Sequence, residues 1–285
     1  MDGGEGASSE SVRPRWVATE LGARVVSAVV LGTVTLVATY AGGWPFALFW
    51  LIAGTTVLAE WLGMTRVEPR LPTQIALGAA LAILSLLYLA GSPLPSFALF
   101  AGGTVLAAAA LGRRSRDPLW SGAGFAYATV ISLVPPVVRD RPELGVVGLL
   151  WMFAVVWGTD VAAYFTGRRL GGPKLWPRVS PKKTWSGFLG GLGAGVLSGI
   201  LVYFVAESFG WDSPVSLTTA AVVSGIASIA SQGGDLAESA LKRRFDVKDS
   251  SHLIPGHGGV MDRLDGFWAV AALVGAILLV LEVVT

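Results

Sequence analysis

Long apolar runs separated by short polar or Gly/Pro-rich breaks follow one another from Arg24 to the C-terminus. Each run has about the 20 residues that a helix needs to cross a bilayer. Pro135 and Pro136 fall inside the fifth run, so we expect that helix to kink or end early. The pattern predicts an all-α polytopic membrane protein with about nine transmembrane helices, at roughly residues 24–42, 44–63, 72–90, 94–112, 118–138, 145–166, 185–206, 215–234 and 264–283.

The composition supports a membrane protein and limits the chemistry. Of the 285 residues, 53% are hydrophobic and 14% are charged, whereas a soluble protein has about 25% charged residues. The chain has no cysteine, which excludes disulfides, thiolate metal sites and a thiol nucleophile. Its only histidines, His252 and His257, argue against a multi-histidine zinc site.

The basic residues predict the orientation of the chain. With the N-terminus in the cytoplasm, the nine predicted spans place all but two of the 21 basic residues in the N-terminal tail and the cytoplasmic segments. The two exceptions, Arg139 and Arg141, lie in an outer loop. This asymmetry follows the positive-inside rule and predicts a cytoplasmic N-terminus and an outer C-terminus.

The two halves of the chain differ in their polar content. Residues 1–23 are expected to form a disordered cytoplasmic tail, and residues 24–140 a transmembrane scaffold with chemically plain loops. Residues 141–285 form the predicted catalytic region, because two long cytoplasmic segments, 167–184 and 235–263, carry most of its polar side chains.

One acidic residue, Asp160, lies within an apolar run, in "VVWGTDVAAYF". A charge at such a depth costs several kcal/mol unless it is paired or faces water, so it is a functional candidate. The alternative is an ion pair with a neighbouring helix.

The segment 167–187 has six basic residues and no acid. Its "SPKKT" stretch places Ser180, Lys182 and Lys183 directly before the next helix. Lysines beside the free N–H groups of a helix start suit a phosphate. Attraction of anionic lipid explains the other basic residues equally well.

The densest polar stretch is residues 231–265. If residues 235–242 are helical, Asp235, Glu238, Ser239 and Lys242 lie on one face, at i, i+3, i+4 and i+7. Carboxylates and a cation on a single stripe suit a metal-and-phosphate site.

Further acids and bases follow in the same stretch. Asp249, Asp262 and Asp265 add hard oxygen ligands of the kind that Mg²⁺ prefers. The glycines of "PGHGG" allow close approach of a ligand. The available phosphate-neutralising cations are Lys242, Arg243, Lys248 and Arg263.

Before any family is considered, these residues favour metal-assisted phosphoryl or nucleotidyl transfer to a lipid at the cytoplasmic leaflet. No P-loop or Rossmann glycine pattern is present. The alternative from another class is an ion-coupled transporter with Asp160 and Asp235 as translocation carboxylates, although transporter sites usually lie near the bilayer midplane. A structural lipid-binding protein would leave the carboxylates unexplained.

The run "SALKRRFDVKDSSHLIPGHGGVMDRLD" (239–265) resembles the signature of the CTP:phosphatidate cytidylyltransferases, or CDP-diacylglycerol synthases. The segments "GDLAES", "SPKKT" and "TDVAAYFTG" are also similar to elements of that family. The signature positions are Ser239, Lys242, Arg243, Lys248, Asp249, Pro255, His257, Gly258, Gly259, Asp262, Arg263 and Asp265.

The resemblance implies the reaction of CTP with phosphatidate to give CDP-diacylglycerol and pyrophosphate. It implies a Mg²⁺-dependent, multi-pass enzyme of the plasma membrane, homodimeric, with its site facing the cytoplasm and no nucleic-acid partner. Related alternatives are a polyprenol kinase-like enzyme and an ether-lipid cytidylyltransferase.

The resemblance and the residue chemistry together give each candidate an expected role. Asp235, Asp262 and Asp265 are the first candidates for metal ligands, and Asp160 and Asp249 the second. His257 is expected to contact a phosphate or relay a proton, with a loop-stabilising hydrogen bond as the alternative. The expected catalytic residues are Asp235, Lys242, Arg243, Lys248, His257 and Arg263. The expected substrate-binding residues are Ser180, Lys182, Lys183, Ser239, Gly258 and Gly259.

Overall fold

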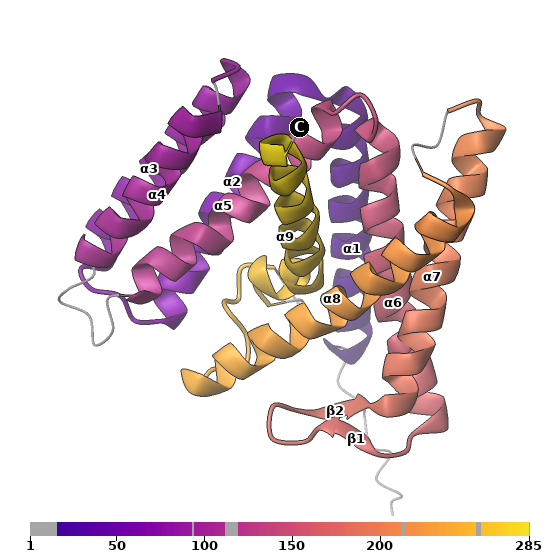
Figure 1. The fold of residues 1–285 in the computed structure, drawn as a ribbon. Helices are drawn as coiled ribbons and strands as arrows, with labels where there is room; N and C mark the ends of the chain where they lie inside the picture. Colours follow the sequence, from indigo (N-terminus) through magenta and orange to yellow (C-terminus); the bar gives the residue numbers. More distant parts are fainter. Residues whose placement is uncertain (1–15, 93, 112–118, 212–214, 255–257, 285) are drawn as a thin grey trace, which may run out of the picture.

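The computed structural model describes residues 16–92, 94–111, 119–211, 215–254 and 258–284 (Figure 1). These residues form helices that follow the apolar runs, because a chain in lipid must satisfy its backbone hydrogen bonds internally. The helices are α1 (Trp16–Ala41), α2 (Gly43–Met64), α3 (Arg70–Leu89), α4 (Leu94–Leu111), α5 (Leu119–Asp140), α6 (Gly145–Leu170), α7 (Trp185–Ser208), α8 (Leu217–Arg244) and α9 (Met261–Val284).

The all-α prediction is confirmed, and one short hairpin is added to it. Residues of the basic segment form a short antiparallel hairpin, β1 (Lys174–Trp176) and β2 (Ser180–Thr184), in which Lys174 pairs with Thr184 and Trp176 with Ser180. The Thr184 hydroxyl then accepts from the Gly187 backbone N–H at 3.1 Å and caps α7. The hairpin therefore leads directly into α7 and holds the predicted phosphate-binding lysines on a strand.

Two predicted boundaries also change. Helix α1 begins at Trp16, within the predicted tail, and residues 1–15 lie outside the described residues. Helix α5 does not end at Pro135 and Pro136 but continues to Asp140. The last turn of α5, after the prolines, is tied to α1, because Arg139 Nε donates to the Thr39 carbonyl oxygen at 2.9 Å.

Within the residues that the structure describes, six helices are long and apolar enough to cross a bilayer: α2, α3, α5, α6, α7 and α9. The described apolar parts of α1 and α4 are shorter, at Val26–Ala41 and Leu99–Ala108, and the C-terminal part of α8 carries the charged stripe. A polytopic membrane fold is confirmed at this level. The nine crossings and the cytoplasmic N-terminus remain predictions.

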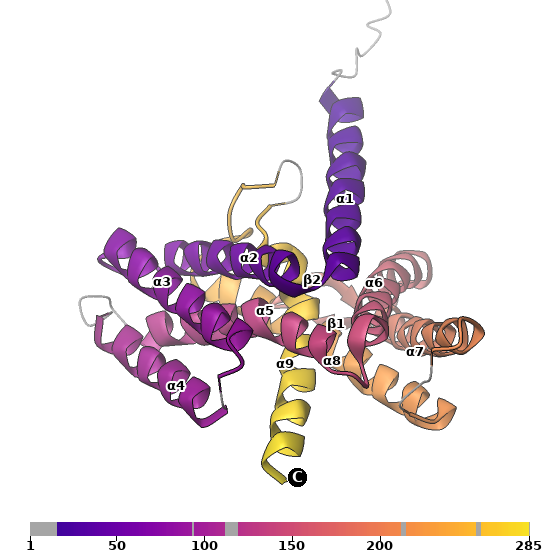
Figure 2. The same ribbon diagram turned by 90° about the horizontal axis from the view of Figure 1, so that it is seen from above.

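Helix α9 lies between two groups of helices (Figure 2). Helices α2 to α5 form one group, and the other contains α6 and α7, which pack against each other more extensively than any other two helices. Helix α1 projects away from both groups (Figure 2). Stacked aromatic rings join the groups: Phe267 of α9 lies 5.1 Å from Trp50 of α2 and 5.3 Å from Phe153 of α6, between ring centroids. This core fixes α9, which carries Asp262 in its first turn and Asp265 three residues later.

Candidate functional site: a carboxylate and lysine cluster

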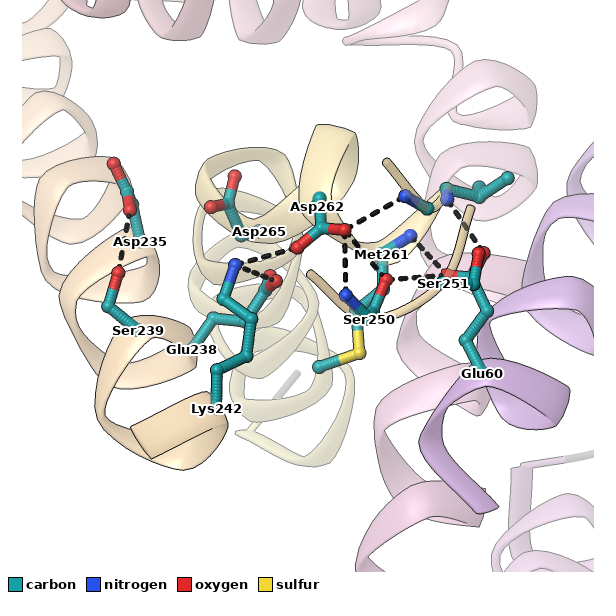
Figure 3. Close-up of polar contacts among 12 residues, drawn as sticks. Glu60, Asp235, Glu238, Ser239, Lys242, Ser250, Ser251, Met261, Asp262 and Asp265 are labelled. Atoms are coloured by element: carbon teal, nitrogen blue, oxygen red, sulfur yellow. Dashed lines mark hydrogen bonds and ion pairs between the residues drawn. The ribbon is translucent and has the colours of Figure 1, made fainter. Parts of the chain in front are cut away.

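Helices α8 and α9 cross closely beside the predicted carboxylates. A Cβ atom placed on Gly234 would lie 2.6 Å from the Ala269 Cβ and 2.7 Å from the Asp265 carbonyl oxygen. Only glycine allows this approach. The crossing brings Asp235 and Glu238 of α8 to the same region as the first turn of α9 (Figure 3).

Lys242 joins the two helices through their acids. Its Nζ lies 3.0 Å from Glu238 Oε1 and 2.6 Å from Asp262 Oδ1 (Figure 3). The three side chains are largely buried, with 13%, 2% and 5% of the Lys242, Glu238 and Asp262 side chains exposed. Glu238 and Lys242 share a face of α8, as predicted, and there they form an i, i+4 ion pair, so that Lys242 lies between two carboxylates.

The second oxygen of Asp262 holds the loop that precedes α9. Asp262 Oδ2 accepts from the backbone N–H of Ser250 at 2.9 Å and from that of Gly259 at 2.8 Å. The Ser250 hydroxyl also lies 2.9 Å from this oxygen. Asp262 therefore has both oxygens engaged by groups of the protein.

The loop and α9 are also held by Glu60 of α2, a residue of the predicted scaffold. Its carboxylate accepts from the Ser251 hydroxyl at 2.7 Å and from the backbone N–H groups of Val260 at 2.9 Å and Met261 at 2.7 Å. The Ser250 hydroxyl lies 3.1 Å from Glu60 Oε2. Four donors thus surround one carboxylate that is 6% exposed.

The basic hairpin contacts the cluster from its other side. Lys183 Nζ of β2 lies 2.5 Å from Asp235 Oδ2, and the Ser239 hydroxyl lies 3.4 Å from Asp235 Oδ1. The Lys183 and Asp235 side chains are 26% and 36% exposed. Strand β2 therefore contacts α8 beside the carboxylate cluster.

Burial and neighbouring charges shift the pKa values of the cluster. Burial, together with the neighbouring Asp265 carboxylate, raises the pKa of Glu238 above its usual range. Burial alone would lower the pKa of Lys242, but the Glu238 and Asp262 carboxylates raise it instead. Lys242 is thus held charged among acids that outnumber it.

The oxygen donors of the cluster match those that Mg²⁺ prefers. Glu238 Oε2 is buried without a hydrogen-bond partner among the described residues, and Asp265 Oδ1 accepts only the N–H of Gly266, at 2.7 Å. Within the described ranges, no group of three His, Cys, Asp or Glu side chains is arranged to hold a metal. Mg²⁺ at nucleotide sites commonly uses one or two carboxylates plus substrate phosphates, so Asp235, Glu238 and Asp265 fit this ion in chemical type.

Other predicted residues make no hydrogen bond or ion pair with this network in the described part of the chain. Asp160 of α6 is one of them, but its carboxyl interacts electrostatically with Asp235, Lys183 and Arg263 and so lies beside the cluster. Arg243 at the end of α8, Lys248 and Asp249 on the loop, and Arg263 on α9 are exposed. Lys182 is exposed on β2, and Ser180 is half-buried where the strand begins.

The predicted residues Gly258 and Gly259 lie in the loop before α9. A Cβ on Gly259 would lie 2.0 Å from Ser250 Oγ, and Gly258 has φ +83°. The close contact at Gly259 and the left-handed backbone at Gly258 show that both glycines shape the loop around Asp262. His257 lies outside the described residues, so its predicted role remains a prediction.

Glu60 and Ser250 were not among the predicted site residues. Glu60 is the only ionisable residue of α2, and the criterion that selected Asp160, a charge within an apolar run, also applies to it. No pattern in the sequence indicates Ser250.

Known proteins are similar to this chain over nearly its full length. The model of the cytidylyltransferase family matches residues 22–281. The chain belongs to that family. The phosphatidate cytidylyltransferase of Brucella suis biovar 1 (strain 1330) is 41% identical over 257 residues, which cover 90% of this chain and 92% of the relative.

Two relatives are similar over a shorter range. The phosphatidate cytidylyltransferase of Haemophilus influenzae (strain ATCC 51907 / DSM 11121 / KW20 / Rd) is 44% identical over 154 residues, or 51% of this chain and 52% of the relative. That of Bacillus subtilis (strain 168) is 40% identical over 130 residues, or 46% of each chain. Membership in the cytidylyltransferase family confirms the resemblance drawn from residues 239–265.

Proposed function

We propose that this membrane protein transfers the cytidylyl group of CTP to phosphatidate, giving CDP-diacylglycerol and pyrophosphate, at the cluster formed by α8, α9 and the β1–β2 hairpin. The observation that carries the proposal is the meeting of lysines and carboxylates at the ends of apolar helices, in a chain of the cytidylyltransferase family. Its relatives over most of the chain are named phosphatidate cytidylyltransferases.

The reaction needs positioning and charge neutralisation more than a strong base. A phosphate oxygen of phosphatidate attacks the α-phosphorus of CTP, a P–O bond forms, and the bond to the β-phosphate oxygen breaks as pyrophosphate leaves. A phosphate monoester with a second pKa of about 6 is largely a dianion at pH 7. The attacking oxygen therefore carries its charge before it enters the site.

The cations of the site have the role of neutralising phosphates. Lys182 and Arg263 are exposed at the site's surface, and Lys183 lies beside Asp235. Fixed cations that face the developing charge stabilise the transition state without reorganisation. Arg243 and Lys248, also exposed, extend the positive surface toward the lipid head group.

Mg²⁺ is the proposed cofactor, and one or two of Asp235, Glu238 and Asp265 would hold it together with the substrate phosphates. The chemistry that it supplies when bound is neutralisation of the triphosphate and of the leaving pyrophosphate. Asp262 adds an oxygen only if Lys242 turns from it toward the triphosphate, because Lys242 and the loop use both Asp262 oxygens. Asp160 and Asp249 remain second candidates.

The proposal also includes the membrane location and the oligomeric state of the enzyme. The distribution of basic residues supports a site at the cytoplasmic face by the positive-inside rule, and the family resemblance supports the plasma membrane. The family resemblance supports a homodimer, which the mass of the detergent-solubilised protein would test.

The test is a reconstituted reaction with purified protein, CTP labelled in its α-phosphate, Mg²⁺ and phosphatidate. The expected product is a labelled CDP-lipid. A panel of polyprenol and ether-lipid acceptors separates the related enzymes. Ion-dependent solute uptake into proteoliposomes without CTP turnover would contradict the proposal and favour a transporter.

A further inference from the structure

Glu60 lies far from the signature in sequence but next to it in space. It is buried near the C-terminal end of α2, a helix without another ionisable residue. A buried carboxylate is costly in an apolar helix unless its oxygens are hydrogen-bonded. Both oxygens of Glu60 meet donors from the loop and from the start of α9.

The contacts of Glu60 cap α9 from another helix. The N–H groups of Val260 and Met261 donate to Glu60 Oε1 and Oε2 at 2.9 and 2.7 Å. The first N–H groups of a helix have no partner within that helix, and a carboxylate there also stabilises the helix dipole. The next residue along α9 is Asp262, so Glu60 holds the backbone from which Asp262 extends.

Ser250 connects Glu60 to Asp262 directly. Its hydroxyl oxygen lies 3.1 Å from Glu60 Oε2 and 2.9 Å from Asp262 Oδ2 (Figure 3). Its backbone N–H donates to Asp262 at 2.9 Å. A shift of Glu60 would therefore be transmitted to Asp262 through one residue.

The packing around Gly259 leaves no room between the loop and Glu60. A Cβ on Gly259 would lie 2.7 Å from each Glu60 carboxylate oxygen. The loop backbone thus rests directly on the carboxylate. This observation is independent of the hydrogen bonds and shows a closely built contact.

We propose that Glu60 is a positioning residue for cytidylyl transfer: the scaffold helix α2 holds the loop and the first turn of α9 through this carboxylate, and so sets the position of Asp262 and Asp265. Glu60 touches no reacting atom. The proposal rests on the proposed function for its catalytic consequence, but the positioning itself is a property of the fold.

The decisive variant is Glu60→Gln, which keeps the side-chain size but replaces one acceptor oxygen with an N–H donor. Losing hydrogen bonds to a charged group is expected to lower kcat by about tenfold or more. The Mg²⁺ concentration for half-maximal activity should rise, and the KM for phosphatidate should stay within about twofold. Glu60→Asp, which keeps the charge, should recover part of the loss. Glu207→Gln is the matched control, because Glu207 is exposed on α7.

A readout without activity separates this proposal from the proposed function. Hydrogen–deuterium exchange at Val260 and Met261 should become faster in Glu60→Gln and remain unchanged in Glu207→Gln. If the wild-type protein makes no CDP-lipid, the proposed function fails while the exchange experiment still tests the positioning.

A second variant decides the matter if Glu60→Gln does not fold. Ser251→Ala removes one donor to Glu60, at 2.7 Å, and Ser251 makes no hydrogen bond with Asp262. It should raise the Mg²⁺ requirement and speed exchange at Met261. Folded Glu60→Gln or Ser251→Ala protein with wild-type exchange and wild-type Mg²⁺ dependence would overturn the proposal, as would a loss of thermal stability alone.

Discussion

The ammonium group of Lys242 lies 2.6 Å from the Asp262 carboxylate and ties α8 to α9. The same ammonium lies 3.0 Å from Glu238, one turn earlier on α8. Two acids that would repel each other are thereby held together in a largely buried site. The arrangement gives the signature a structural role in addition to its chemical one.

Replacing Lys242 should therefore affect both folding and catalysis. Lys242→Met keeps most of the side-chain volume but leaves two buried carboxylates without their cation. Removing one partner of a buried ion pair costs about 3–5 kcal/mol, and CDP-lipid formation should be lost. Unfolding in detergent measures the loss of stability. The control is Lys174→Met, on the exposed strand β1. Equal stability of the two variants would contradict this role of Lys242.

Replacing Asp262 with Asn should abolish CDP-diacylglycerol formation while the protein remains folded. Asn keeps the shape, but its amide N–H₂ meets either the Lys242 ammonium or the loop donors. The unsatisfied donors should lower the free energy of unfolding by about 1–3 kcal/mol. Activity and thermal unfolding are measured on the same preparation, and full activity would remove Asp262 from the site.

Adjacent glycines on α8 should respond differently to alanine. Gly234→Ala pushes α8 away from α9 and is expected to cost about 1–3 kcal/mol by overpacking, with a loss of activity. Gly233 has no atom within 4 Å of an added Cβ, so Gly233→Ala should be neutral or stabilise by up to about 1 kcal/mol. Thermal unfolding and turnover of the two variants test the close crossing of α8 and α9 at Gly234. Identical behaviour of the two variants would contradict it.

Lys183 should matter for catalysis and little for stability. Its ion pair with Asp235 is partly exposed, and such pairs contribute about 1 kcal/mol or less. Loss of a phosphate-neutralising cation in Lys183→Met should lower kcat/KM for CTP by about tenfold or more. Steady-state kinetics measures kcat/KM for CTP of Lys183→Met and of the control Lys174→Met. An unchanged kcat/KM would place Lys183 outside the substrate site.

The sequence was sufficient to predict the helices and most of the carboxylates, for clear physical reasons. Apolar runs of bilayer length bounded by glycine, proline or charge determine where helices lie, and helical spacing placed Glu238 and Lys242 on one face. The hairpin at 174–184 was missed because its three- and five-residue strands leave no period-2 signal long enough to read.

Contacts between distant segments could not be predicted. Glu60 meets Ser250, Ser251 and Met261 across roughly 190–200 positions of sequence, and no local pattern encodes such a pairing. The pairing of Lys242 with Asp262, and hence the engagement of both Asp262 oxygens, also depends on how α8 and α9 cross.

The most direct test of the central claim is the transfer of label from α-phosphate-labelled CTP to phosphatidate by purified protein, with and without Mg²⁺. Asp265→Asn is compared with Asp246→Asn, whose carboxyl is exposed on the loop after α8. The account predicts a Mg²⁺-dependent labelled CDP-lipid from the wild type and Asp246→Asn, and almost none from Asp265→Asn. Full Mg²⁺-dependent activity in Asp265→Asn, or no CDP-lipid from the wild type, would contradict it.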